Sequence, residues 1–108
     1  MTQKLDTLHH TAIQVADIAQ AVKWYTDRFN CEVEYQDDTW AMLKFANVSL
    51  AFVKSEQHPY HFAIVTETPE DFGIPKKHRD GTSSVYIKDP FGNNVEMLKL
   101  ADDEYSYE

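Results

Sequence analysis

The sequence predicts an α+β fold of two βαβββ modules, the second one shortened, which form a curved, cleft-bearing mixed sheet or half-barrel. The length of 108 residues suits one domain. An alternating strand pattern is followed by an amphipathic helix pattern and then by short strands joined by turns. Residues 10–15 are echoed by residues 61–66, since each stretch starts with His and has Ala two residues later. This duplication predicts module one at about 7–55 and module two at about 61–100, before an acidic tail at 101–108.

Module one begins with a strand over residues 8–15, which places His10 and Gln14 on one face. Asp17 is a typical helix N-cap, and Gln20 completes a capping box. The helix has an apolar stripe made of Ile18, Val22, Tyr25 and Phe29, widened by Ala21 and Trp24. We expect Asn30 to end this helix, because Asn tolerates the left-handed conformation.

Short strands account for most of the remaining chain. Module one continues with strand patterns at 31–35, 39–45 and 49–54. Polar or small turns between them favour antiparallel hairpins, and the polar segment 55–60 is the best linker. Module two has strand patterns at 61–66, 83–88 and 94–100. A helix start at Thr68 is cut short by Gly73 and Pro75, and the turn at 89–92 has Pro and Gly where a turn prefers them.

Composition excludes several classes of function. The formal net charge of −8 disfavours binding to nucleic acid or to anionic membranes. No apolar run reaches the length of a membrane span, and the first residues lack the pattern of a signal peptide. Cys31 is the only cysteine, so we expect a buried structural thiol and no internal disulfide. These features fit a cytoplasmic protein.

Four stretches together resemble the vicinal oxygen chelate superfamily, which includes glyoxalase I, extradiol dioxygenases, fosfomycin-resistance transferases and bleomycin-resistance proteins. They are residues 8–17, the Trp24-Tyr25 pair, residues 61–65 and residues 84–96. Each stretch alone is weak evidence, but their order and spacing are fairly specific. The resemblance covers the chain from about residue 8 to residue 100.

The resemblance implies a metal site made of the first-strand His of each module and a Glu on the last strand. These positions are His10, His61 and Glu96. Two imidazoles and one carboxylate suit a divalent ion such as Fe(II), Mn(II), Ni(II) or Zn(II), and leave positions open for substrate. A lone His on a strand is usually structural; two His at matching positions of a repeat, plus the Glu, favour metal binding.

The resemblance also implies catalytic roles for Tyr86, which would hydrogen-bond a metal-bound substrate, and for Glu96, which would serve as a base. Three further residues share a strand face with these groups or suit a cavity wall, so we expect them to bind substrate: Gln14, Lys88 and Trp40. The alternative reading of Tyr86 and Trp40 is packing, and that of Gln14 and Lys88 is exposure to water. His9 is expected to be structural and to face the helix, whereas His58 and His78 are expected to be solvated.

The chain departs from known members in ways that narrow the function. Residues 49–54 hold no acid to act as the fourth ligand of glyoxalase I, so typical glyoxalase I activity is not expected. Ala12 stands where the fosfomycin-resistance pattern has Thr, and the additional catalytic His of extradiol enzymes has no clear equivalent.

Three functions therefore stay open. The first is a metal-dependent enzyme, dioxygenase-like or lyase- or transferase-like, that chelates a small oxygen-bearing substrate. The second is a metal-free binding or resistance protein of the bleomycin-binding kind, and the third is a vestigial subunit with a role in assembly. Small members with two modules commonly dimerise, so we expect a homodimer, with modules exchanged between chains as one arrangement.

Overall fold

The computed structural model describes residues 4–78 and 80–101. The described chain contains one α-helix, one short 3-10 helix and eight strands, which confirms the predicted α+β class. It divides into two compact units. The N-terminal unit is His9–Phe62, and the C-terminal unit consists of the described parts of 1–8 and 63–108. No helix in the described chain has the length and apolar character needed to cross a membrane.

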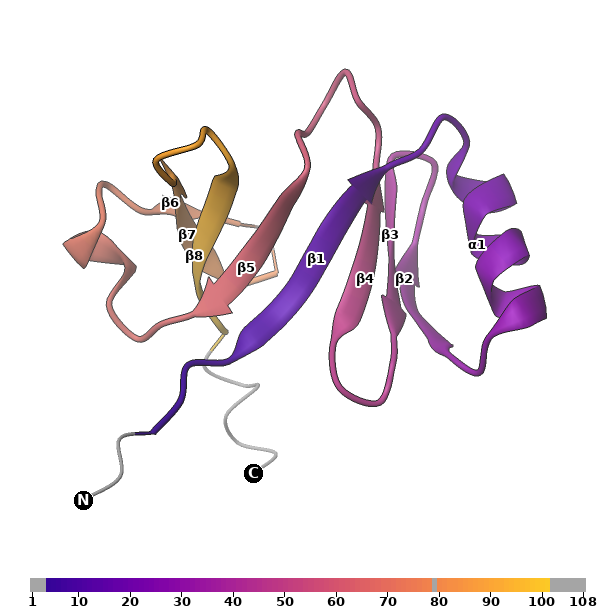
Figure 1. Ribbon diagram of the computed structural model, residues 1–108, viewed down its shortest axis with the longest axis horizontal. Coiled ribbons are helices and arrows are strands. Elements are labelled where there is room, and N and C mark those ends of the chain that lie inside the picture. Colours follow the sequence, from indigo (N-terminus) through magenta and orange to yellow (C-terminus); the bar gives the residue numbers. More distant parts are fainter. Residues whose placement is uncertain (1–3, 79, 102–108) are drawn as a thin grey trace. The chain divides into compact units, whose positions relative to one another are not determined.

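The N-terminal unit has the predicted βαβββ order (Figure 1). Its elements are β1 (Leu8–Gln14), α1 (Ile18–Arg28), β2 (Glu32–Gln36), β3 (Trp40–Lys44) and β4 (Ser49–Val53). The strands lie side by side in the order β2-β3-β4-β1. β1 pairs with β4 in parallel, whereas the β2–β3 and β3–β4 pairs are antiparallel hairpins. The sheet of this unit is therefore mixed, as predicted.

Helix α1 begins and packs as the sequence predicts. The Asp17 side chain accepts a hydrogen bond from the backbone N–H of Gln20 at 2.9 Å, which caps the first turn. Ile18 and Val22 are buried and form a core cluster with three residues of β3 and β4: Ala41, Leu43 and Phe52. The apolar stripe is thus the reason why α1 covers one face of this sheet.

The predicted left-handed helix end at Asn30 is wrong. The helix ends at Arg28, and Phe29 is extended (φ −127°, ψ 148°) while its N–H still bonds to the carbonyl of Tyr25. No described residue other than glycine has a positive φ. The chain leaves the helix directly into an extended path because β2 starts only four residues after Arg28, at Glu32.

The C-terminal unit repeats the strand order of the N-terminal unit. Its elements are the part of β5 (His61–Val65) from Ala63 onward, η1 (Pro69–Asp71), β6 (Lys76–Lys77), β7 (Ser83–Lys88) and β8 (Asn94–Lys99); His61 and Phe62 of β5 belong to the N-terminal unit. The order β6-β7-β8-β5 corresponds to β2-β3-β4-β1. The match extends to single hydrogen bonds: Val15 N–H bonds to Val53 O at 2.9 Å, and Thr66 N–H bonds to Leu98 O at 2.8 Å. The second module is therefore a full copy in topology, with the helix reduced to η1 and β2 reduced to β6.

The hairpin between β7 and β8 has the predicted turn. Gly92 donates its N–H to the carbonyl of Asp89 at 3.1 Å and has φ +88°, which a residue with a Cβ rarely adopts. The Asp89 carboxylate accepts bonds from the backbone N–H groups of Phe91 and Asn93. These contacts set the register that pairs Tyr86 with Glu96.

The described chain ends at Ala101, the first residue of the predicted tail at 101–108. Ala101 is buried, with 5% of its surface exposed. Its Cβ lies 3.1 Å from where a Cβ would stand at Gly81, so Gly81 makes room for it. The remainder of the predicted tail, 102–108, lies outside the described residues.

Candidate metal centre

The sheet of the N-terminal unit has a second face, opposite α1, and this face carries His10. In the parallel β1–β4 register His10 pairs with Ser49, and Ala12 pairs with Ala51. Because side chains alternate along a strand, these four residues share one face. Ala12 and Ala51 are buried there with Val53, against Trp40 and Met42. The imidazole of His10 therefore stands beside small neighbours on a largely apolar surface.

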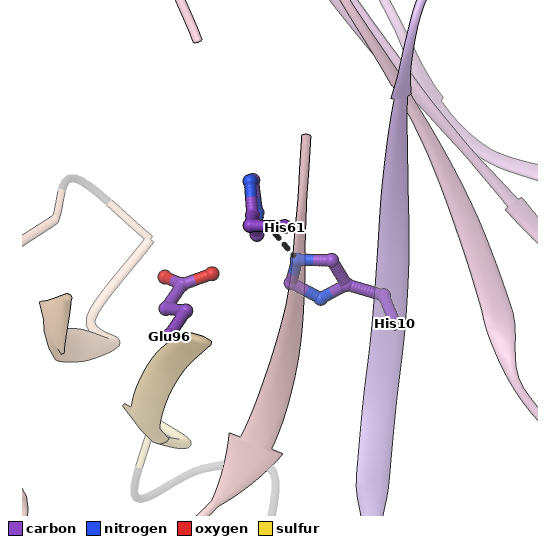
Figure 2. Close-up of side chains that lie close together, drawn as sticks. All are labelled: His10, His61 and Glu96. Atoms are coloured by element: carbon purple, nitrogen blue, oxygen red, sulfur yellow. Dashed lines mark hydrogen bonds between the residues drawn. The ribbon is translucent and has the colours of Figure 1, made fainter. Parts of the chain in front are cut away.

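His61 is the first residue of β5, and its ring faces that of His10 (Figure 2). Both side chains are buried, each with 8% of its surface exposed. Their Nε2 atoms lie 3.4 Å apart, and the two rings are nearly perpendicular, at 80°. The two nitrogen atoms thus point to a common region from two strands that are 51 residues apart in sequence.

The other nitrogen of His61 is held by the backbone. Its Nδ1 lies 3.1 Å from the carbonyl oxygen of Pro59. A carbonyl can only accept, so Nδ1 carries the proton and donates it. In the neutral ring the lone pair is therefore on Nε2, which is the form that binds a metal.

His9 contacts His10 in a way that the sequence analysis missed. The Nδ1 atoms of the two rings lie 2.8 Å apart. The strand alternation assigned His9 to the opposite face and to a structural role. The doublet of adjacent histidines was the available signal, because the Nδ1 atom sits close enough to the backbone for neighbouring rings to meet.

Glu96 lies on β8 in the C-terminal unit and is buried, with 6% exposed; it is the third side chain drawn in Figure 2. Its partner across the hairpin is Tyr86, whose hydroxyl donates a hydrogen bond to the carboxylate. Partial desolvation of the phenol, the charge of Glu96 and this hydrogen bond together raise the pKa of Tyr86 well above its usual value of about 10, although 42% of the Tyr86 surface is exposed. Tyr86 is therefore a protonated donor throughout the neutral range.

The chemistry of these donors fits a divalent metal. Among the described residues, His10, His61 and Glu96 form a buried group that could hold a metal ion, each offering one ligand atom. Two imidazole nitrogens and one carboxylate oxygen are ligands that Fe(II), Mn(II), Ni(II) and Zn(II) accept.

The repeat also shows which residue stands where a fourth protein ligand would be. Ala51 lies two residues before Val53, and Glu96 lies two residues before Leu98. Because the bonds to Val53 and Leu98 are equivalent in the two modules, Ala51 is the counterpart of Glu96. A methyl group offers no ligand, and β4 holds no acid.

The three residues predicted to bind substrate each make a hydrogen bond or a ring contact within the chain. The Gln14 amide donates to the carbonyl of His58 at 2.9 Å, and Lys88 donates to the Asn94 side chain at 2.8 Å. Trp40 stacks on Tyr35 with ring centres 4.3 Å apart and an angle of 24°. By the β3–β4 register, Trp40 shares the face of Val53, which is also the face of His10. Their substrate roles stay predictions.

Of the predicted environments of His58, His78 and Cys31, only that of His58 matches the structure. His58 is exposed, as expected. His78 is half-buried, and its Nε2 lies 2.8 Å from the Ser84 hydroxyl, so the expectation of a solvated ring is wrong. Cys31 is half-buried rather than fully buried and packs against the core under α1.

Comparisons with known proteins agree with this architecture. Residues 7–75, well over half of the chain, match the model of a family described as the Glyoxalase/Bleomycin resistance protein/Dioxygenase superfamily. A search of curated proteins found no significant match.

Solved structures with the same fold include three with TM-scores near 0.7. A hypothetical protein from Bacillus halodurans C-125 has a TM-score of 0.69 at 16% identity, covering 92% of this chain and 97% of that chain. A glyoxalase/bleomycin resistance protein/dioxygenase superfamily member from Vibrio splendidus 12B01 has a TM-score of 0.68 at 13% identity, covering 89% and 100%. A protein described as NAD-dependent benzaldehyde dehydrogenase from Legionella pneumophila has a TM-score of 0.68 at 13% identity, covering 84% and 97%. At these identities the likeness shows the fold alone.

Proposed function

The chain belongs to the glyoxalase/bleomycin resistance protein/dioxygenase superfamily, and on that premise we propose that it is a metal-dependent enzyme acting on a small oxygen-bearing substrate. His10, His61 and Glu96 bind one divalent ion, which is Fe(II), Mn(II), Ni(II) or Zn(II). Three protein ligands would leave positions of such an ion open to oxygens of a substrate.

The observation that carries this proposal is the approach of two imidazole nitrogens in a buried place. Two nitrogens bound at about 2.0–2.1 Å to one ion with a tetrahedral angle are about 3.3–3.4 Å apart. The Nε2 atoms of His10 and His61 are 3.4 Å apart. The hydrogen bond from His61 Nδ1 to Pro59 leaves the Nε2 lone pair directed at the same region. The spacing and burial of the pair, and the tautomer of His61, agree with metal ligation.

The residues around this pair have separate tasks. Bound metal supplies Lewis acidity toward the oxygens of the substrate. The Glu96 carboxylate has two oxygens, so one can bind metal while the other keeps the hydrogen bond from Tyr86. Tyr86 has one hydroxyl hydrogen, so it donates to a substrate oxygen, or acts as a general acid, only when its hydrogen bond to Glu96 is released. Glu96 serves as the base that accepts a substrate proton.

The absence of a carboxylate at Ala51 separates this site from a typical glyoxalase I, which uses a fourth protein ligand. A site with three protein ligands leaves more positions for substrate or a second reactant. We therefore propose a dioxygenase-like or a lyase- or transferase-like reaction.

Metal analysis of protein purified without chelator tests the proposal. We expect about one divalent ion per chain in the wild type and less than about a tenth of that in His61→Ala. His78→Ala is the control, because the His78 ring bonds to the Ser84 hydroxyl and is not one of the three ligands, and it should keep its metal. A wild type without metal after supply of each candidate ion contradicts the proposal, as does metal that persists in His61→Ala.

A second candidate function rests on one specific observation. The stacked Tyr35–Trp40 pair offers aromatic surface on the face that carries His10, and Tyr35 remains 40% exposed. Such a surface suits a metal-free protein that sequesters a cationic aromatic drug. Tight drug binding by metal-free protein, lost in Trp40→Ala and unchanged in His61→Ala, would favour this function over the enzyme.

A further inference from the structure

We propose that His9 is a positioning residue for His10, and that these two imidazoles exchange tautomers when metal binds. The inference rests on the proposed function, since it concerns the same site. Its basis is a row of four groups in the N-terminal unit: His9, His10, His61 and the carbonyl of Pro59. The successive distances are 2.8 Å, 3.4 Å and 3.1 Å.

The Pro59 carbonyl determines which ring nitrogens carry protons when no metal is bound. The Pro59 carbonyl only accepts, so His61 carries its proton on Nδ1 and has a lone pair on Nε2. Two lone pairs facing each other at 3.4 Å would repel, so His10 carries its proton on Nε2. With neutral rings, Nδ1 of His10 is then the acceptor and Nδ1 of His9 is the donor in the 2.8 Å contact.

Metal binding requires the opposite arrangement in His10. A ligand nitrogen must present its lone pair, so the proton of His10 has to leave Nε2 and appear on Nδ1. It then needs an acceptor, and Nδ1 of His9 is 2.8 Å away. His9 becomes that acceptor by carrying its own proton on Nε2.

The exchange conserves protons. Each neutral ring holds one ring proton before metal binding and one afterwards, so the three rings hold three in both states. His10 moves its proton from Nε2 to Nδ1, and His9 moves its proton from Nδ1 to Nε2, with water as the carrier. No net acid or base is consumed, and His61 keeps its proton on Nδ1 throughout.

We expect His9 to orient His10 through the position of its Nδ1 atom rather than through the bulk of its ring. His9 and His10 are adjacent on β1, so the strand backbone sets the distance between their Nδ1 atoms. Loss of such an orienting partner typically weakens metal binding by about 10- to 100-fold. Two variants separate the hydrogen bond from packing: His9→Asn keeps a polar atom near the position of Nδ1, whereas His9→Phe keeps a ring without nitrogen.

The experiment combines imidazole ¹⁵N NMR with Zn²⁺ affinity measured by chelator competition, on full-length protein whose folding is checked by circular dichroism. In the wild type we expect His10 protonated on Nε2 without metal and on Nδ1 with Zn²⁺. Relative to wild type, Zn²⁺ affinity should fall about 10- to 100-fold in His9→Phe and less than about threefold in His9→Asn.

The experiment distinguishes loss of the positioning role of His9 from absence of the metal site. If His9→Phe binds Zn²⁺ as tightly as wild type, or if metal-free His10 already has its proton on Nδ1, the positioning role is overturned while the metal site stands. If the folded wild type binds no Zn²⁺ or other candidate ion, the proposed function itself is overturned, and the exchange with it.

Discussion

At the scale of single residues, the strand register brings the side chains of Tyr86 and Glu96 together and so changes their chemistry. Neither side chain is unusual alone. The β7–β8 hairpin sets them opposite each other, and desolvation of the phenol, followed by the charge of Glu96 and the hydrogen bond to it, raises the pKa of Tyr86. A donor hydroxyl that does not ionise near neutral pH is what a substrate oxygen requires.

The raised pKa of Tyr86 gives a prediction at alkaline pH. The neutral phenol is favoured in the folded state, so its contribution to stability is present below about pH 10 and is lost as pH rises above that value. In folded protein at about pH 11, wild type and Tyr86→Phe should therefore show the same increase in tyrosinate absorbance at 295 nm. A wild-type increase larger by one tyrosine would show that Tyr86 ionises normally.

The site residues differ in how far the sequence could predict them. His10 and His61 were predictable because the repeat marks both, and Glu96 because a Pro-Gly turn precedes its strand. His9 was missed because simple alternation places neighbouring residues on opposite faces of a strand. Alternation describes the direction of Cβ, whereas the contact is made by Nδ1 atoms further along the side chain.

At the scale of elements, the β2–β3 turn is organised by one carboxylate. Asp37 accepts bonds from the hydroxyls of Tyr35 and Thr39 and from the backbone N–H groups of Thr39 and Trp40. These bonds, that of Tyr35 first, lower the pKa of Asp37 far below its usual value. The turn therefore depends on an ionised side chain.

This dependence predicts how acid affects the hairpin. A lowered pKa means that the stabilising effect is complete above about pH 4 and is lost as pH falls further. Asp37→Asn should lower the unfolding temperature at pH 7, and its difference from wild type should shrink toward pH 2 in thermal melts followed by circular dichroism. A difference that is constant over this range would contradict the role of the charge.

The core under α1 gives a prediction that is independent of the metal site. Ile18 is 3% exposed and packs on the face of the sheet opposite His10. Ile18→Ala should lower the free energy of unfolding by about 2–4 kcal/mol in urea titrations. Metal affinity of the folded variant should change less than about threefold, and a larger loss would show that the two faces are coupled.

Elements were predictable where their pattern is long. The structure confirms the cap of α1 and the Ile18 and Val22 part of its apolar stripe. Trp24 and Phe29 of the predicted stripe are exposed, and the helix ends before Asn30. β6 was not predicted, because Lys76–Lys77 offers no apolar alternation and exists as a strand only through pairing with β7. Tertiary pairing, rather than local propensity, defines such an element.

At the scale of the whole molecule, exposed apolar side chains favour association. Leu5, Tyr60, Ile74 and Phe91 are each at least 60% exposed. Association with a second chain would remove such side chains from water. We predict a homodimer, so light scattering coupled to gel filtration should give twice the mass of the chain. A monomer at about 100 μM would contradict this.

The central claim is that one ion is shared by His10, His61 and Glu96. The most direct measurement is an anomalous difference map from crystals of metal-loaded protein, recorded above and below the absorption edge of that metal. We expect one peak per chain within about 2.0–2.2 Å of Nε2 of both histidines and of a Glu96 oxygen. A peak at other residues, or no peak between the two imidazoles in loaded crystals, would contradict the account.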